Sequence, residues 1–180
     1  AGIAYTGGPI PLGYLGLGDV FVFVFFGLIA VIGTVYVQAV TTLQILFPVG
    51  IYWQFIPSAA IISSIAVGCI TTNILVVNNI RDIETDRQAG KKTLAVRLGY
   101  RFSRLQYLSL YGIAYVVPIW LFVNGYSWVI LFPELTLPFA GVLSYKVFQY
   151  RSGEKMDELL KQTGMLLTSF SILLTIGFIL

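Results

Sequence analysis

Long apolar stretches alternate with short polar segments along the whole chain. A helix needs about 20 mostly apolar residues to cross the hydrocarbon core of a bilayer. Stretches of that kind run from about 20 to 40, 57 to 77, 105 to 123, 128 to 148 and 163 to 180. The pattern predicts an all-α integral membrane protein, a single membrane domain over residues 1–180 with about five transmembrane helices.

The fourth apolar stretch is the weakest, because Pro133, Glu134 and Pro138 interrupt it. A carboxylate in the middle of a membrane costs several kcal/mol unless it is paired or hydrated. We therefore expect Glu134 to lie near the outer surface, with the helix proper beginning there or bent by the prolines. A carboxylate inside the membrane is the alternative.

The composition agrees with a membrane protein. Of 180 residues, 57% are hydrophobic and only 11% are charged, whereas soluble domains carry roughly 25% charged residues. The chain contains no histidine and one cysteine, Cys69. Catalysis by a histidine triad and an internal disulfide scaffold are therefore excluded, and nothing in the composition favours binding of nucleic acid.

The basic residues predict the orientation of the helices. Seven of the eleven Lys and Arg residues lie between Arg81 and Arg104, and the other four lie between 146 and 161. The links near 41–56 and 124–127 contain neither residue type. The positive-inside rule then places 78–104 and 146–161 on the cytoplasmic side or its topological equivalent. The opening residues 1–19, two spans earlier, are expected on the same side.

Most of the polar chemistry lies in residues 78–104, which we call the motif segment and expect to be a loop after the second span. If the helical pitch continues, Asn78, Asp82 and Asp86 fall on one face at i, i+4 and i+8. Two carboxylates and an amide oxygen in that order form an edge of the kind that Mg²⁺ prefers, usually together with water and substrate phosphates.

Basic residues follow the acidic ones directly. Arg87, Lys91, Lys92 and Arg97 come next, and Gly90 among them permits a sharp turn. Carboxylates that hold a metal beside a basic cluster suit a diphosphate, because its charge is neutralised by both kinds of group. Solvated ion pairs and residues that only set the topology are the alternative interpretation.

Two stretches resemble a known family. The run NNIRDIETDRQAGKKTLAVRLG, residues 78–99, resembles the second aspartate-rich motif of the UbiA superfamily of membrane prenyltransferases, in the form found in 1,4-dihydroxy-2-naphthoate prenyltransferases (the MenA type). The opening AYTGGPIPLGYLGLGDVFVFVFFG, residues 4–27, resembles the same branch. That family has nine transmembrane helices and two aspartate-rich motifs. The five spans resemble its helices 5–9, so we expect a C-terminal half that lacks the first motif and is inactive without the missing N-terminal half.

The resemblance implies transfer of a polyprenyl or phytyl group from its diphosphate to 1,4-dihydroxy-2-naphthoate, with loss of CO₂, in menaquinone or phylloquinone biosynthesis. It implies Mg²⁺ as cofactor, a bacterial plasma membrane or a thylakoid or plastid membrane as location, and the lipid bilayer, the prenyl diphosphate and the aromatic substrate as partners. Asp82 and Asp86 are then the catalytic, metal-binding carboxylates, with Asn78 as a further metal ligand. The residues expected to bind substrate are Asn78, Asn79, Arg81, Lys91, Lys92, Arg97 and Tyr5.

Several alternatives stay open at this stage. Arg97 is equally well explained as a topology residue, and the loop around Tyr5 as a tight connection. Another branch of the superfamily, acting on 4-hydroxybenzoate or homogentisate, is a second possibility. A non-catalytic membrane subunit and a transporter fragment are the others. The length of the prenyl chain and the oligomeric state do not follow from the sequence.

Overall fold

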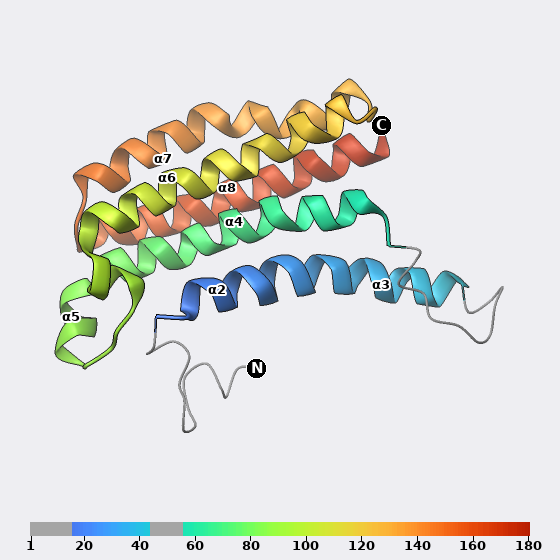
Figure 1. Cartoon of the computed structure of the whole chain (residues 1–180). Coiled ribbons are helices and arrows are strands. Elements are labelled where there is room, and N and C mark those ends of the chain that lie inside the picture. Colours follow the sequence, from blue (N-terminus) through green and yellow to red (C-terminus); the bar gives the residue numbers. More distant parts are fainter. Residues whose placement is uncertain (1–15, 44–55) are drawn as a thin grey trace.

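The computed structural model describes residues 16–43 and 56–180, and these residues form a bundle of long helices (Figure 1). The first helical rod consists of α2 (Gly18–Val22), a π-helical segment η2 (Phe23–Ile29) and α3 (Ala30–Leu43). After it come α4 (Ser58–Arg81), α5 (Ile83–Gln88), α6 (Leu94–Val123), the 3₁₀ segment η4 (Trp128–Thr136), α7 (Leu137–Gln149) and α8 (Glu154–Ile179). Five of the resulting helical units are long and apolar enough to cross a membrane, which confirms the expected all-α membrane fold.

Helix α4 lies in the middle of the bundle. It packs on the first rod along one side and on α6 and α8 along the other, and α7 covers α6 and α8 from outside (Figure 1). The core is therefore formed by the facing sides of α4, α6 and α8, with fully buried side chains such as Ile70, Tyr107 and Phe170. The first rod is much more exposed, because few of its residues are buried inside the bundle.

The two segments that contain the basic residues, 81–104 and 146–161, which we call the first and second basic regions, meet at one end of the bundle. Helix α5, the start of α2 and the start of α8 all lie at that end (Figure 1). Arg104 of α6 donates from Nε to the carbonyl of Val147 at 2.9 Å and from Nη2 to the carbonyl of Tyr150 at 3.0 Å. These bonds satisfy carbonyls at the C-terminal end of α7. Arg104 thus connects the motif segment to the second basic region.

The motif segment is not the expected loop. Residues 78–81 are the last turn of α4, 83–88 form α5, and α6 begins at Leu94. Gly99 interrupts α6 with φ 77° and ψ 178°, so the helix around the third span starts directly after it, a few residues before 105. The helix around the fifth span starts at Glu154 rather than near 163. Charged residues do not prevent helix formation outside the lipid, and Thr93 caps α6 by accepting a hydrogen bond from the Val96 N–H at 3.3 Å. The apolar pattern therefore identifies only the part of a helix that lies in lipid, and it does not identify the charged turns that extend the helix beyond the membrane.

The fourth span combines two helix types. Residues Trp128–Thr136 are 3₁₀-helical, and the α-helix proper begins at Leu137, after Glu134 and next to Pro138. The prolines explain the change, because each lacks the N–H that an α-helical hydrogen bond requires. Glu134 is half-buried, and among the described residues its Oε1 has no hydrogen-bond partner.

Candidate active site

The three proposed oxygen ligands, Asn78, Asp82 and Asp86, lie where α4 ends and α5 begins. Asp82 interrupts the helix with φ −98° and ψ 8°. The Asp82 N–H nevertheless donates to the Asn78 carbonyl at 3.1 Å, and the Asp86 N–H donates to the Asp82 carbonyl at 2.8 Å. The i, i+4, i+8 spacing of the three residues is therefore kept across the break. Asp82 is half-buried and Asp86 is buried.

Arg81 is the centre of the first group of polar side chains. Its Nε and Nη2 donate to the two carboxylate oxygens of Asp82 at 2.8 and 2.9 Å. Nη2 also donates to Oδ1 of Asn78 at 2.9 Å, and Nη1 donates to Oδ1 of Asp157 at 2.7 Å. One guanidinium thus gathers three oxygen-bearing side chains from the end of α4 and the first turn of α8.

Asp86 belongs to a second group, with Lys91. The Lys91 Nζ donates to Oδ1 of Asp86 at 2.6 Å. The chain returns over Asp86 because Gly90 adopts a positive φ of 72°. The Gly90 N–H donates to the Arg87 carbonyl at 3.2 Å and the Lys91 N–H to the Asp86 carbonyl at 2.9 Å, which is the pair of bonds of a Schellman motif. The sharp turn expected at Gly90 is therefore present.

The remaining expected site residues are spread around these groups. Lys92 and Arg97 are exposed at the start of α6, and Asn79 is buried in the last turn of α4. Gly16 approaches the motif segment closely, since a Cβ added there would lie 2.7 Å from the Lys92 carbonyl oxygen and 3.7 Å from Nε of Arg97. Tyr5 lies outside the described residues.

Two carboxylates at this end of the bundle were missed by sequence reasoning. Asp157 contacts Arg81, as described above. Asp19, in the first turn of α2, is buried and accepts a hydrogen bond from Nε2 of Gln106 on α6 at 3.2 Å. No periodicity links residue 157 to residue 81. The available signal for Asp19 was its being a lone carboxylate at the start of a charge-free span.

The donor chemistry of the site suits a hard divalent cation, although the described part of the chain does not complete a metal site. Carboxylate and amide oxygens of Asp82, Asp86 and Asn78 are suitable ligands for Mg²⁺, which also takes water and phosphate oxygens. Within residues 16–43 and 56–180 no group of three or more His, Cys, Asp or Glu side chains lies close enough to hold a metal. Further oxygen ligands would therefore have to come from a substrate diphosphate, from water or from other parts of the protein.

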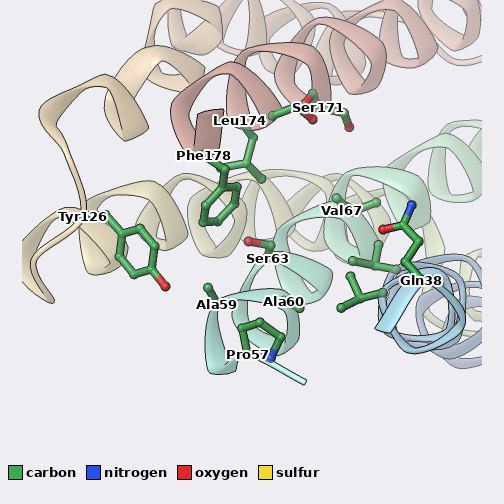
Figure 2. A pocket seen from close by; sticks show the side chains of 13 residues that line it. Gln38, Pro57, Ala59, Ala60, Ser63, Val67, Tyr126, Ser171, Leu174 and Phe178 are labelled. Carbon is green, nitrogen blue, oxygen red and sulfur yellow. The ribbon is translucent and has the colours of Figure 1, made fainter. Parts of the chain in front are cut away.

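A cavity of about 670 Å³ lies towards the opposite end of α4 (Figure 2). Its walls come from α3, the first half of α4 and the last turns of α8, with Tyr126 beside them. The lining residues are Val31, Val35, Gln38, Pro57, Ala59, Ala60, Ser63, Val67, Tyr126, Ser171, Leu174, Thr175 and Phe178. Most of this lining is apolar. Ser63 and Asp82 are separated along α4 by about 28 Å at the usual rise of a helix.

Comparison with known proteins identifies the family. The family model described as the UbiA prenyltransferase family matches residues 1–170. The chain belongs to the UbiA prenyltransferase family. Together with the five apolar helices, this membership establishes an integral membrane protein.

The curated relatives within this family have related names. A 1,4-dihydroxy-2-naphthoate octaprenyltransferase from Haemophilus influenzae is 34% identical over all of this chain and 54% of the relative. One of the same name from Mycobacterium tuberculosis is 37% identical over 89% of this chain and 50% of the relative. A 2-carboxy-1,4-naphthoquinone phytyltransferase from Synechocystis is 31% identical over 83% of this chain and 44% of the relative. The chain thus spans about half the length of the curated relatives that it matches. No solved structure matches it.

Proposed function

We propose that this chain forms one wall of the active site of a Mg²⁺-dependent aromatic prenyltransferase. The reaction would transfer a polyprenyl or phytyl group from its diphosphate to 1,4-dihydroxy-2-naphthoate, with loss of CO₂, in menaquinone or phylloquinone biosynthesis. The names of the relatives support this choice of substrates. The observation that carries the proposal is the pairing of Asp82 with Arg81 and of Asp86 with Lys91 at one end of a membrane bundle.

The proposed reaction requires that the bond between the prenyl carbon and the diphosphate oxygen ionises. Mg²⁺, when bound, would neutralise the charge that develops on the diphosphate. Asp82 and Asp86 would hold the metal ion, with Asn78 as a third oxygen ligand. Asn79, which is buried beside this edge, would support it. These side chains occupy one end of the bundle, so the diphosphate would bind where the charged residues lie.

The basic side chains would bind the diphosphate itself. Arg81 presents a planar guanidinium that matches two phosphate oxygens at once. Lys91, Lys92 and Arg97 follow it on the turn after α5 and at the start of α6. Lys92 and Arg97 are exposed, so they are accessible to a substrate. Tyr5 stays our candidate for a contact with the aromatic ring.

The prenyl tail would run from this charged end toward the apolar cavity between α3, α4 and α8. Ser63, in the part of α4 that lines the cavity, lies about 28 Å from Asp82 along the helix, a distance close to the thickness of the hydrocarbon core. Its lining residues, such as Val67, Leu174 and Phe178, are mainly apolar, as a hydrocarbon tail requires. The proposed location is a bacterial plasma membrane or a thylakoid or plastid membrane, with the charged end on the cytoplasmic side.

The proposed enzyme would also need the first aspartate-rich motif, supplied by an N-terminal half. We suggest testing the activity with a hybrid enzyme, in which this chain replaces the matching segment of the Haemophilus influenzae relative. Membranes that contain the hybrid enzyme, the chain alone or the unchanged relative are incubated with 1,4-dihydroxy-2-naphthoate and a prenyl diphosphate, with and without Mg²⁺.

The proposal expects prenylated product from the hybrid enzyme only when Mg²⁺ is present, and none from the chain alone. An inactive hybrid enzyme that is correctly inserted, beside an active relative, would count against the proposed reaction. Activity with 4-hydroxybenzoate or homogentisate in place of the naphthoate would favour another branch of the family. Activity of the chain alone would contradict the need for a second half.

A further inference from the structure

We propose that Asp157 is a positioning residue that holds Arg81 in place for the diphosphate while Asp82 turns to the metal ion. This inference rests on the proposed function. Its starting point is the contact between Nη1 of Arg81 and Oδ1 of Asp157 at 2.7 Å, which joins the end of α4 to the first turn of α8.

The two edges of the Arg81 guanidinium have different partners. The edge formed by Nε and Nη2 is occupied by both carboxylate oxygens of Asp82 and by the Asn78 amide oxygen. The remaining nitrogen, Nη1, donates to Asp157. When Asp82 and Asn78 turn their oxygens to a metal ion, the first edge becomes available to two phosphate oxygens. Asp157 alone among these partners can keep its bond to Arg81 during that exchange.

The first turn of α8 is built to keep the Asp157 carboxylate in place. Met156 and Leu159, on either side of it in the sequence, are both fully buried, with 0% of their surface exposed. The Met156 N–H donates to the carbonyl of Gly153 at 2.8 Å, which fixes the start of the helix. Asp157 itself is half-exposed, with 51% of its side-chain surface accessible. Its backbone is therefore fixed while its carboxylate stays at the surface where the charged groups gather.

The same turn contains a matched control. Glu154 is also an acidic side chain in the first turn of α8 and is exposed, but the four hydrogen bonds of the Arg81 guanidinium do not include it. Replacing Glu154 by Gln removes the same charge from the same turn. A general effect of negative charge on an anionic ligand would then appear in both variants, whereas the positioning of Arg81 would be lost in one.

The test measures binding of inorganic diphosphate, in the presence of Mg²⁺, to the purified hybrid enzyme in detergent by titration calorimetry, with each substitution made in the segment supplied by this chain. We expect Asp157→Asn to weaken binding about fivefold, the upper range for a half-exposed ion pair, and Glu154→Gln to leave the affinity within twofold. Arg81→Lys should also weaken binding, and Asp157→Asn should cause no further loss in that background, because residues that act through one contact are not additive.

Three results would overturn the inference. Unchanged or tighter binding by Asp157→Asn would show that Asp157 does not anchor Arg81. Fully additive losses in the double variant would show that Asp157 acts independently of Arg81. If Asp157→Asn does not fold, Asp157→Ser replaces it, and binding by this variant, which has no carboxylate, as tight as that of the unsubstituted hybrid enzyme would also contradict the inference. A failure of the unsubstituted hybrid enzyme to bind diphosphate would instead count against the proposed site as a whole.

Discussion

Gly27 and Gly68 bring the first membrane helix into backbone contact with α4. A Cβ added at Gly27 would collide with the Cα of Gly68 and lie 3.2 Å from the carbonyl oxygen of Ser64. Gly27 lies in the π-helical segment Phe23–Ile29, so the wider turn occurs where the two helices cross. Small residues allow membrane helices to approach in this way. The contact sets the position of α2, whose start meets the motif segment.

We expect Gly27→Ala to destabilise the protein by about 1–3 kcal/mol, because the colliding atoms are backbone and cannot move aside. Gly33→Ala is the matched control, since a Cβ there meets no atom within 4 Å. Both changes replace a helical glycine by alanine, so the difference between their unfolding free energies measures the effect of the close contact between the two helices. Equilibrium unfolding in mixed detergent measures it. Equal stability of the two variants would contradict the close packing.

Tyr107 connects α6 to α8 through a buried hydrogen-bond network. Its hydroxyl lies 2.9 Å from both the Tyr111 hydroxyl and Oγ1 of Thr163. We expect Tyr107→Phe to cost about 1 kcal/mol of unfolding free energy, within the range measured for polar contacts between membrane helices. The same unfolding assay checks this value, with the exposed Tyr145→Phe as control. A loss no larger than that of the control would argue against the network.

The turn at Gly90 is expected to matter for substrate binding. Its φ of 72° costs other residues roughly 1–2 kcal/mol, and Asn tolerates it better than Ala does. We expect Gly90→Ala to raise the KM for prenyl diphosphate in the hybrid enzyme, and Gly90→Asn to raise it less, because the turn carries Lys91 back to Asp86. Gly112→Ala, where a Cβ meets no atom within 4 Å, should leave the KM unchanged. Equal KM values for all three variants would show that the turn at Gly90 does not contribute to substrate binding.

The cavity between α3, α4 and α8 is expected to limit the length of the prenyl tail. Ala60 lines this cavity, so Ala60→Phe should shift the hybrid enzyme towards shorter prenyl diphosphates. Mass spectrometry of products from a mixture of chain lengths measures the shift. Ile113→Phe adds bulk on an exposed face of α6 and serves as the control. An unchanged product distribution for Ala60→Phe would place the tail elsewhere.

The fold was predictable because lipid demands long apolar helices and the basic residues repeat on every second connection. The helix starts at Leu94 and Glu154 were not, since the turns that precede the apolar stretches contain charged residues. Hydropathy indicates which residues lie in lipid, whereas the start of a helix is determined by its hydrogen bonds. The start of α6 is marked instead by its N-cap residue Thr93, which accepts a hydrogen bond from the nearby Val96 N–H.

The candidate site was predictable where its residues are close in sequence. The spacing of Asn78, Asp82 and Asp86 gave their common backbone register, and Gly90 indicated the turn. The partner of Arg81 on α8 was beyond reach, because the contact between residues 81 and 157 depends on how two distant helices pack. The same holds for Asp19 and Gln106. Long-range pairs of this kind leave no periodic trace in one sequence.

The most direct test of the proposed function is the substitution Asp82→Asn in the hybrid enzyme. It keeps the size of the side chain and removes the charge that the proposed metal ion needs. We expect prenyl transfer to 1,4-dihydroxy-2-naphthoate to fall by about 100-fold or more at saturating Mg²⁺, as when one electrostatic group of an active site is lost. Glu84→Gln, an exposed carboxylate that pairs with Arg87 at 2.8 Å, should stay within twofold of the original rate. A near-normal rate for Asp82→Asn would contradict the assignment of Asp82 as a metal ligand and, with it, the proposed mechanism.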